Sequence, residues 1–67
     1  MPQKIRELIK KLKDAGFIEI GGAGKGSHRK FTHEKYPGAV TISGSLGDDA
    51  KQYQVKQVNN AIERVKE

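Results

Sequence analysis

A histidine and several basic residues lie together near the middle of the chain, in the segment Lys25-Gly26-Ser27-His28-Arg29-Lys30. Free imidazole titrates at about pH 6.5, so a histidine both accepts and donates protons near neutral pH. Lys25, Arg29 and Lys30 can neutralise charge on phosphoryl oxygens, and the backbone N–H groups of 24–27 can form an anion-binding nest. These groups suit cleavage of RNA, in which the internal 2′-hydroxyl is the nucleophile and no metal is needed. DNA lacks that hydroxyl and is expected to be spared.

The same residues also have interpretations that involve no catalysis. A single exposed histidine on a strand is usually an ordinary surface residue. The glycine-rich run 21–26 lacks the Gly-Lys-Ser/Thr ending of a Walker A loop and is typical of a hairpin loop. Asp48 and Asp49 lack the spaced oxygens of a calcium loop and are better suited to capping a helix.

Length and composition restrict the classes of protein to consider. The chain has 67 residues, which predicts one domain over 1–67. It has no cysteine, which excludes disulfides, a thiolate nucleophile and Cys-based metal centres, and two histidines alone make a poor metal set. We therefore expect no metal and no cofactor. The net charge of +5 and a pI near 9.7 favour a polyanionic partner, with nucleic acid the first to test, although a basic surface also serves solubility.

The hydropathy pattern predicts a protein of the cytoplasm. The apolar runs are too short for a membrane span, and the first residues lack the apolar region of a signal peptide. No membrane partner is expected.

Two segments have helical periodicity. From Pro2 to Ala15 the apolar residues recur at i, i+3, i+4 and i+7, with basic residues on the remaining surface and Gly16 as a C-terminal stop. The second helix is predicted over Lys51 to Lys66, with Asp48 or Asp49 as its N-cap or first-turn acid. The predicted apolar stripes are Ile5, Leu8, Ile9 and Leu12 in the first helix and Val55, Val58, Ile62 and Val65 in the second.

Three extended segments lie between the helices. They are Phe17 to Ile20, Ser27 to His33 and Ala39 to Ser43, and Tyr36-Pro37-Gly38 is predicted as the second turn. The order helix, three strands, helix predicts an α+β fold, with a three-stranded antiparallel sheet covered by both helices on one face. The other face stays open.

Period two along the strands predicts which side chains reach the open face. If Phe31 points to the helices, Ser27, Arg29 and His33 share its side, whereas His28, Lys30 and Thr32 point outward. In the first strand, Ile18 and Ile20 are predicted to point inward and Glu19 outward. A bulge would shift this register by one residue.

The chain resembles a known family in several segments. These are the helix ending Asp14-Ala15-Gly16-Phe17, the triplet Gly26-Ser27-His28, the basic-Phe-x-His pattern at 30–33, and the segment Ala50-Lys51-Gln52-Tyr53-Gln54-Val55-Lys56-Gln57-Val58. Together they are similar to the HicA family of toxin/antitoxin mRNA interferases, over nearly the whole chain. The loop 21–26 departs from the family, because it is richer in glycine than the usual Arg-Gln-x-Gly-Ser-His sequence.

The resemblance implies a fold, an activity and a partner. The fold is the α-β-β-β-α arrangement similar to double-stranded-RNA-binding domains, and the activity is endoribonuclease cleavage of mRNA with an essential histidine, which transfers to His28. The partner is a HicB-type antitoxin that covers the active face and in many systems binds DNA; direct DNA binding by this chain is not expected. Gly26 and Ser27 match the motif and would shape the turn before His28, whereas RNA contacts by Lys25, Arg29 and Lys30 are inferred from charge.

Two other functions are compatible with the same pattern. A noncatalytic double-stranded-RNA-binding module would use the same order of elements, but it needs a basic cluster at the start of the second helix, where this chain has Asp48, Asp49 and one lysine. A protein-interaction adaptor would dock an acidic partner and be indifferent to His28. For the nuclease, the second acid/base group is open between water, Lys30 and the substrate.

Overall fold

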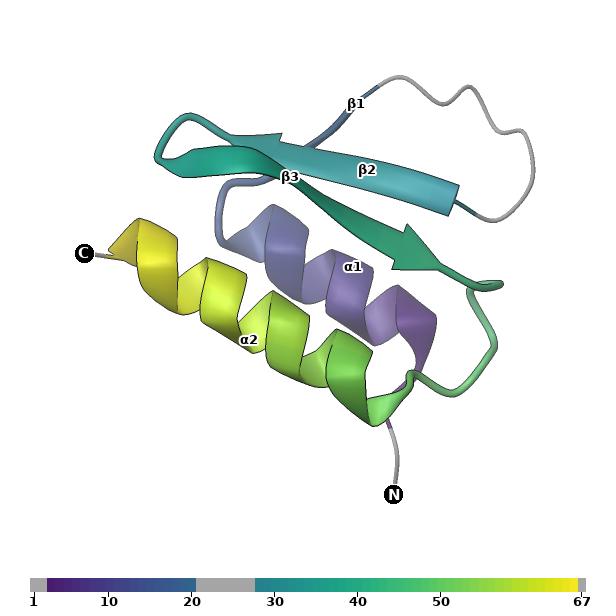
Figure 1. Ribbon diagram of the computed structural model, residues 1–67. Helices are drawn as coiled ribbons and strands as arrows, with labels where there is room; N and C mark the ends of the chain where they lie inside the picture. The colour runs from purple at the N-terminus through teal and green to yellow at the C-terminus, as the bar shows by residue number, and fades with distance from the viewer. Residues whose placement is uncertain (1–2, 21–27, 67) are drawn as a thin grey trace.

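The computed structural model describes residues 3–20 and 28–66. Two helices lie side by side under one face of a three-stranded sheet, and no helix or strand among the described residues covers the other face (Figure 1). This arrangement confirms the predicted α-β-β-β-α layout. The elements are α1 (Ile5–Asp14), β1 (Ile18–Ile20), β2 (His28–His33), β3 (Tyr36–Ser43) and α2 (Gln52–Lys66).

Helix α1 begins later than its periodicity predicted. Lys4 has extended backbone angles and forms a β-bridge with Asp49, so helical geometry starts only at Ile5. The Lys4 ammonium also lies 2.6 Å from the Asp49 carboxylate. At the other end, Gly16 has a φ of +101°, and a Cβ there would lie 3.1 Å from the His33 ring. Glycine is therefore the residue that lets the chain turn directly from α1 into the sheet.

The sheet is antiparallel, in the order β1-β2-β3. The hairpin between β2 and β3 turns at Glu34 and Lys35, because His33 already pairs with Tyr36. The predicted turn at 36–38 is therefore wrong, and those residues belong to β3. Four positions separate Tyr36 from Val40 but only two separate their partners His33 and Phe31, so 37–38 fall in a bulge. Proline lacks an N–H for the ladder and Gly38 has a φ of +82°, which suits both residues to that bulge.

Helix α2 is not capped by an aspartate. The carboxylate of Asp48 accepts the N–H of Ser45 at 3.1 Å, and Asp49 pairs with Lys4. The N–H of Lys51, next to the first helical residue, is instead accepted by the side chain of Gln54 at 2.8 Å. The predicted aspartate cap is wrong because tertiary contacts engage both carboxylates elsewhere.

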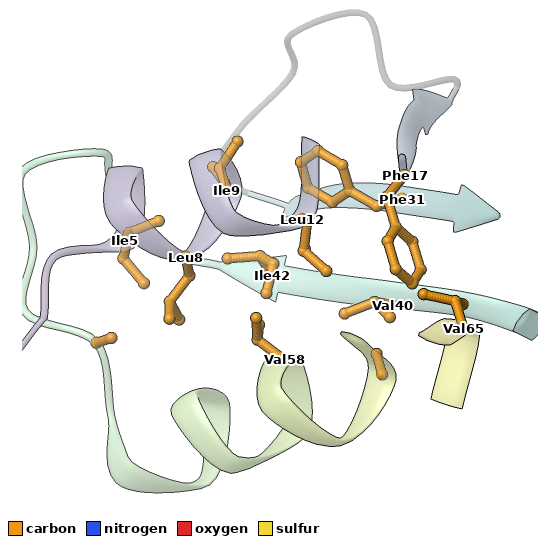
Figure 2. Close-up of a cluster of buried hydrophobic side chains, with 12 residues drawn as sticks. Ile5, Leu8, Ile9, Leu12, Phe17, Phe31, Val40, Ile42, Val58 and Val65 are labelled. Carbon is orange, nitrogen blue, oxygen red and sulfur yellow. The ribbon is translucent and has the colours of Figure 1, made fainter. Parts of the chain in front are cut away.

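The core lies between the helices and the sheet (Figure 2). All four predicted positions of α1 are buried. In α2 the stripe is rotated slightly, since Gln54, Val58, Ala61 and Val65 are buried and Val55 and Ile62 pack partly against the core. Phe31, Val40 and Ile42 complete the core from the sheet, each with 0% exposure. Within the described residues, no helix has the length and apolar character that a membrane crossing requires.

Candidate functional site

The alternation of β2 places His28 and Lys30 on the uncovered face of the sheet. Both residues are exposed, whereas Phe31 is fully buried against the helices. Successive residues of a strand point to opposite faces, so His28 and Lys30 lie on one side, roughly 7 Å apart along the strand. The predicted facing of the described residues of this strand is confirmed.

The side chains of β1 face the opposite sides of the sheet from those predicted. Ile18 pairs with Thr32 and Ile20 with Lys30, and directly opposite residues share a face. Ile18 is 66% exposed and Ile20 is 40% exposed, so both isoleucines point away from the helices. The preceding residue, Phe17, is 3% exposed and occupies the core position, and period two then turns 18 and 20 outward. The missed signal is the aromatic residue directly after Gly16.

The uncovered side of the sheet is here called the open face, and it combines a histidine, a cation, hydroxyls and an apolar edge. Lys30 is flanked across the sheet by Ile20 on one side and Thr41 on the other, and His28 is opposite Ser43. The residues that define it are Ile18 and Ile20 of β1, His28, Lys30 and Thr32 of β2, and Thr41 and Ser43 of β3.

The charges near His28 separate onto the two faces of the sheet. Arg29 lies on the helix side, where its guanidinium is 3.5 Å from the carboxylate of Glu19, the register partner of Phe31. Lys30 forms no ion pair with any carboxylate in the described parts of the chain. Lys30 is therefore available to an anion beside His28, whereas Arg29 faces away from it.

The second histidine, His33, makes contacts that stabilise the fold. The Nδ1 atom of His33 accepts the N–H of Lys35 at 2.9 Å and so braces the hairpin turn. Its ring packs against Phe17, with ring centroids 5.1 Å apart. His33 is five residues from His28, roughly 16 Å along an extended strand, and points to the opposite face. It cannot share a substrate phosphate with His28.

A shallow pocket of 240 Å³ lies near His33 rather than near His28. Its lining is Gly16, Ile18, Thr32, His33 and Glu34. Among the described residues, no group of three or more histidines, cysteines or carboxylates is placed to hold a metal ion. The predicted site residues Lys25, Gly26 and Ser27 lie outside the described residues, so of the predicted set the structure brings together His28 and Lys30.

Comparison with known proteins identifies the family. No curated protein and no solved structure matches the chain. A family model described as the HicA toxin of bacterial toxin-antitoxin matches residues 5–65. That range includes α1, all three strands, the open face that carries His28, and all but the last residue of α2. The chain therefore belongs to the HicA family of toxins from bacterial toxin-antitoxin systems.

Proposed function

We propose that this toxin is an endoribonuclease that cleaves mRNA on the open face, with His28 as its general acid/base. The observation that carries the proposal is the exposed pair of His28 and Lys30 on one face of β2. A substrate needs access to both side chains, and a sheet face that no described helix or strand covers gives access to an extended strand of RNA. Membership in a toxin family supports a destructive activity of this kind.

The chemistry follows from the roles of these two side chains. His28 removes the proton from a 2′-hydroxyl, whose oxygen attacks the adjacent phosphorus and forms a cyclic phosphate as the bond to the 5′-oxygen breaks. Lys30 neutralises the negative charge that builds on the phosphoryl oxygens. Because His33 faces the other side of the sheet and Lys30 is assigned to the phosphoryl charge, we assign protonation of the leaving oxygen to water at this exposed surface. Lys25, Gly26 and Ser27 remain in the proposal as phosphate contacts ahead of His28.

The proposal is tested with an RNA and a DNA of the same sequence, each incubated with the purified toxin in EDTA. We expect cleavage of the RNA to products ending in a 2′,3′-cyclic phosphate and no cleavage of the DNA, because only RNA carries the nucleophile. Equal cleavage of the DNA would exclude the 2′-hydroxyl mechanism. Binding of RNA without cleavage would instead support the noncatalytic RNA-binding module.

We also propose that a HicB-type antitoxin inhibits the toxin by covering the open face. Toxin-antitoxin membership implies a protein partner, and a cover over His28 and Lys30 excludes substrate most directly. The exposed isoleucines of β1 give that surface an apolar edge beside its charged centre. A partner protein could therefore bury apolar area at this edge and pair with the charged centre beside it.

Replacing both edge isoleucines in the variant Ile18→Thr/Ile20→Thr is expected to weaken antitoxin binding by roughly 10- to 100-fold. Fully burying one isoleucine contributes about 1.5–3 kcal/mol, and threonine keeps the strand propensity. Isothermal titration of the purified toxin with its cognate antitoxin measures the change. Leu46→Thr is the matched control, since Leu46 is 43% exposed but lies in the connection between β3 and α2. Equal affinities for the double variant and wild type would remove β1 from the interface.

A further inference from the structure

Gln54 is a polar residue inside the core of this small fold. It is 3% exposed, and both ends of its amide are engaged. The Nε2 group donates a hydrogen bond to the backbone oxygen of Ser43 at 2.9 Å, and Oε1 accepts the N–H of Lys51 at 2.8 Å. A buried amide is costly without partners, so these two hydrogen bonds fix the side chain in place. Gln54 thus ties the first turn of α2 to the end of β3.

The hydrogen bond from Gln54 reaches the residue that pairs with His28 across the sheet. Ser43 is the last residue of β3, and its register partner is His28, the first residue of β2. The imidazole of His28 is exposed, so the position of its backbone depends on the pairing between these strand ends. Ile42, next to Ser43, is fully buried and holds the strand to the core on one side. Gln54 holds the carbonyl at the strand end itself.

We propose that Gln54 is a positioning residue for His28, acting through Ser43. This inference rests on the proposed function, because it assigns Gln54 a role in placing the histidine that performs the cleavage. Without the Nε2 donor, the carbonyl of Ser43 loses this hydrogen bond and the end of β3 is free to shift toward water. His28 then moves with its strand partner relative to Lys30, which is anchored farther along β2 by the pairing with Thr41.

Two variants of Gln54 separate positioning from helix capping. Gln54→Met removes both hydrogen bonds at similar volume. Gln54→Glu in its ionised form keeps an oxygen to accept the N–H of Lys51 but places a second oxygen against the Ser43 carbonyl, so this form breaks only the bond that leads to His28. If Gln54 only caps α2, Gln54→Glu is expected to keep the wild-type kcat.

The matched control is Val65→Ala in the same helix. Val65 is 8% exposed and lies eleven residues from Gln54, roughly 16 Å along the helix axis. The substitution destabilises the fold without touching β3 near Ser43. All chains are assayed for RNA cleavage at a temperature at which circular dichroism shows them folded.

We expect both Gln54 variants to lower kcat by roughly tenfold with little change in KM, because a displacement near 1 Å can cost up to about 10²-fold in rate. We expect Val65→Ala to keep the wild-type kcat. NMR provides a readout independent of activity, namely the cross-strand NOEs and amide shifts of His28 and Ser43. These are expected to change in both Gln54 variants and to persist in Val65→Ala.

Unchanged NOEs and shifts in a folded Gln54 variant would overturn the inference, as would a kcat equal to that of Val65→Ala. If Gln54→Met does not fold, Gln54→Glu alone decides between these results. If the wild-type chain cleaves no RNA, the proposed function fails, and the catalytic role of Gln54 is overturned with it. A loss of the His28–Ser43 NOEs in the Gln54 variants would then show only that Gln54 positions the backbone of His28.

Discussion

His28→Ala is expected to abolish RNA cleavage and, with it, growth arrest on induction, while leaving the chain folded. General acid/base catalysis by a positioned side chain contributes on the order of 10²–10⁴-fold. The His28 side chain is exposed, so its removal leaves no cavity in the core. Cleavage of a purified RNA, growth of the induced strain and circular dichroism of the variant measure the three parts of this expectation.

The second histidine supplies a matched control for this result. His33→Asn keeps a side-chain acceptor near the N–H of Lys35 and alters the helix-facing side of β2 only. Where this variant is folded, we expect it to cleave RNA. A folded His28→Ala that cuts RNA and arrests growth like the wild type would show that His28 is not the catalyst. Growth arrest without RNA cleavage by the wild type would favour the adaptor interpretation.

Phe31→Ala is expected to lower the free energy of unfolding by about 3–5 kcal/mol, the largest loss among the substitutions considered. Phe31 is fully buried in the middle strand and belongs to the core cluster to which both helices and β3 also contribute (Figure 2). Truncating a buried phenylalanine costs about 3–5 kcal/mol. A chain of 67 residues has a total free energy of unfolding of only about 3–10 kcal/mol, at about 0.05–0.15 kcal/mol per residue. One substitution therefore removes a large share of the stability.

Urea denaturation followed by circular dichroism measures this loss. Ile18→Ala is the control from the same sheet, because Ile18 is apolar but 66% exposed on the open face. We expect its free energy of unfolding to stay within about 0.5 kcal/mol of the wild type. Similar losses in both variants would contradict the assignment of the two faces of the sheet.

The helices and the middle strand could be predicted because each has a clear local pattern. The apolar residues of α1 recur at one spacing, and all four are buried. In β2, Phe31 is the one large apolar residue, so it sets the face of every neighbour, including His28 and Lys30. These patterns were sufficient to place the proposed catalytic histidine on the uncovered side.

The errors occur where a residue had two possible partners. In β1, the isoleucines and Phe17 competed for the core, and the aromatic ring packs there against His33 and Tyr36. In the connection before α2, Asp48 and Asp49 had cap signals but bind Ser45 and Lys4 instead. The proline and glycine of β3 indicate a turn locally but form a bulge, because β2 and β3 pair on both sides of them.

By itself, the sequence determined the order of the elements, the buried stripe of α1, the exposed positions of His28 and Lys30, and a family resemblance that the family comparison confirms. Only the tertiary structure decided the facing of β1, the place of the hairpin turn and the link from Gln54 through Ser43 to His28. The physical reason is the distance along the sequence between the residues that interact. Periodicity records which face of one element is apolar, whereas register and buried hydrogen bonds depend on residues that meet only after the elements pack.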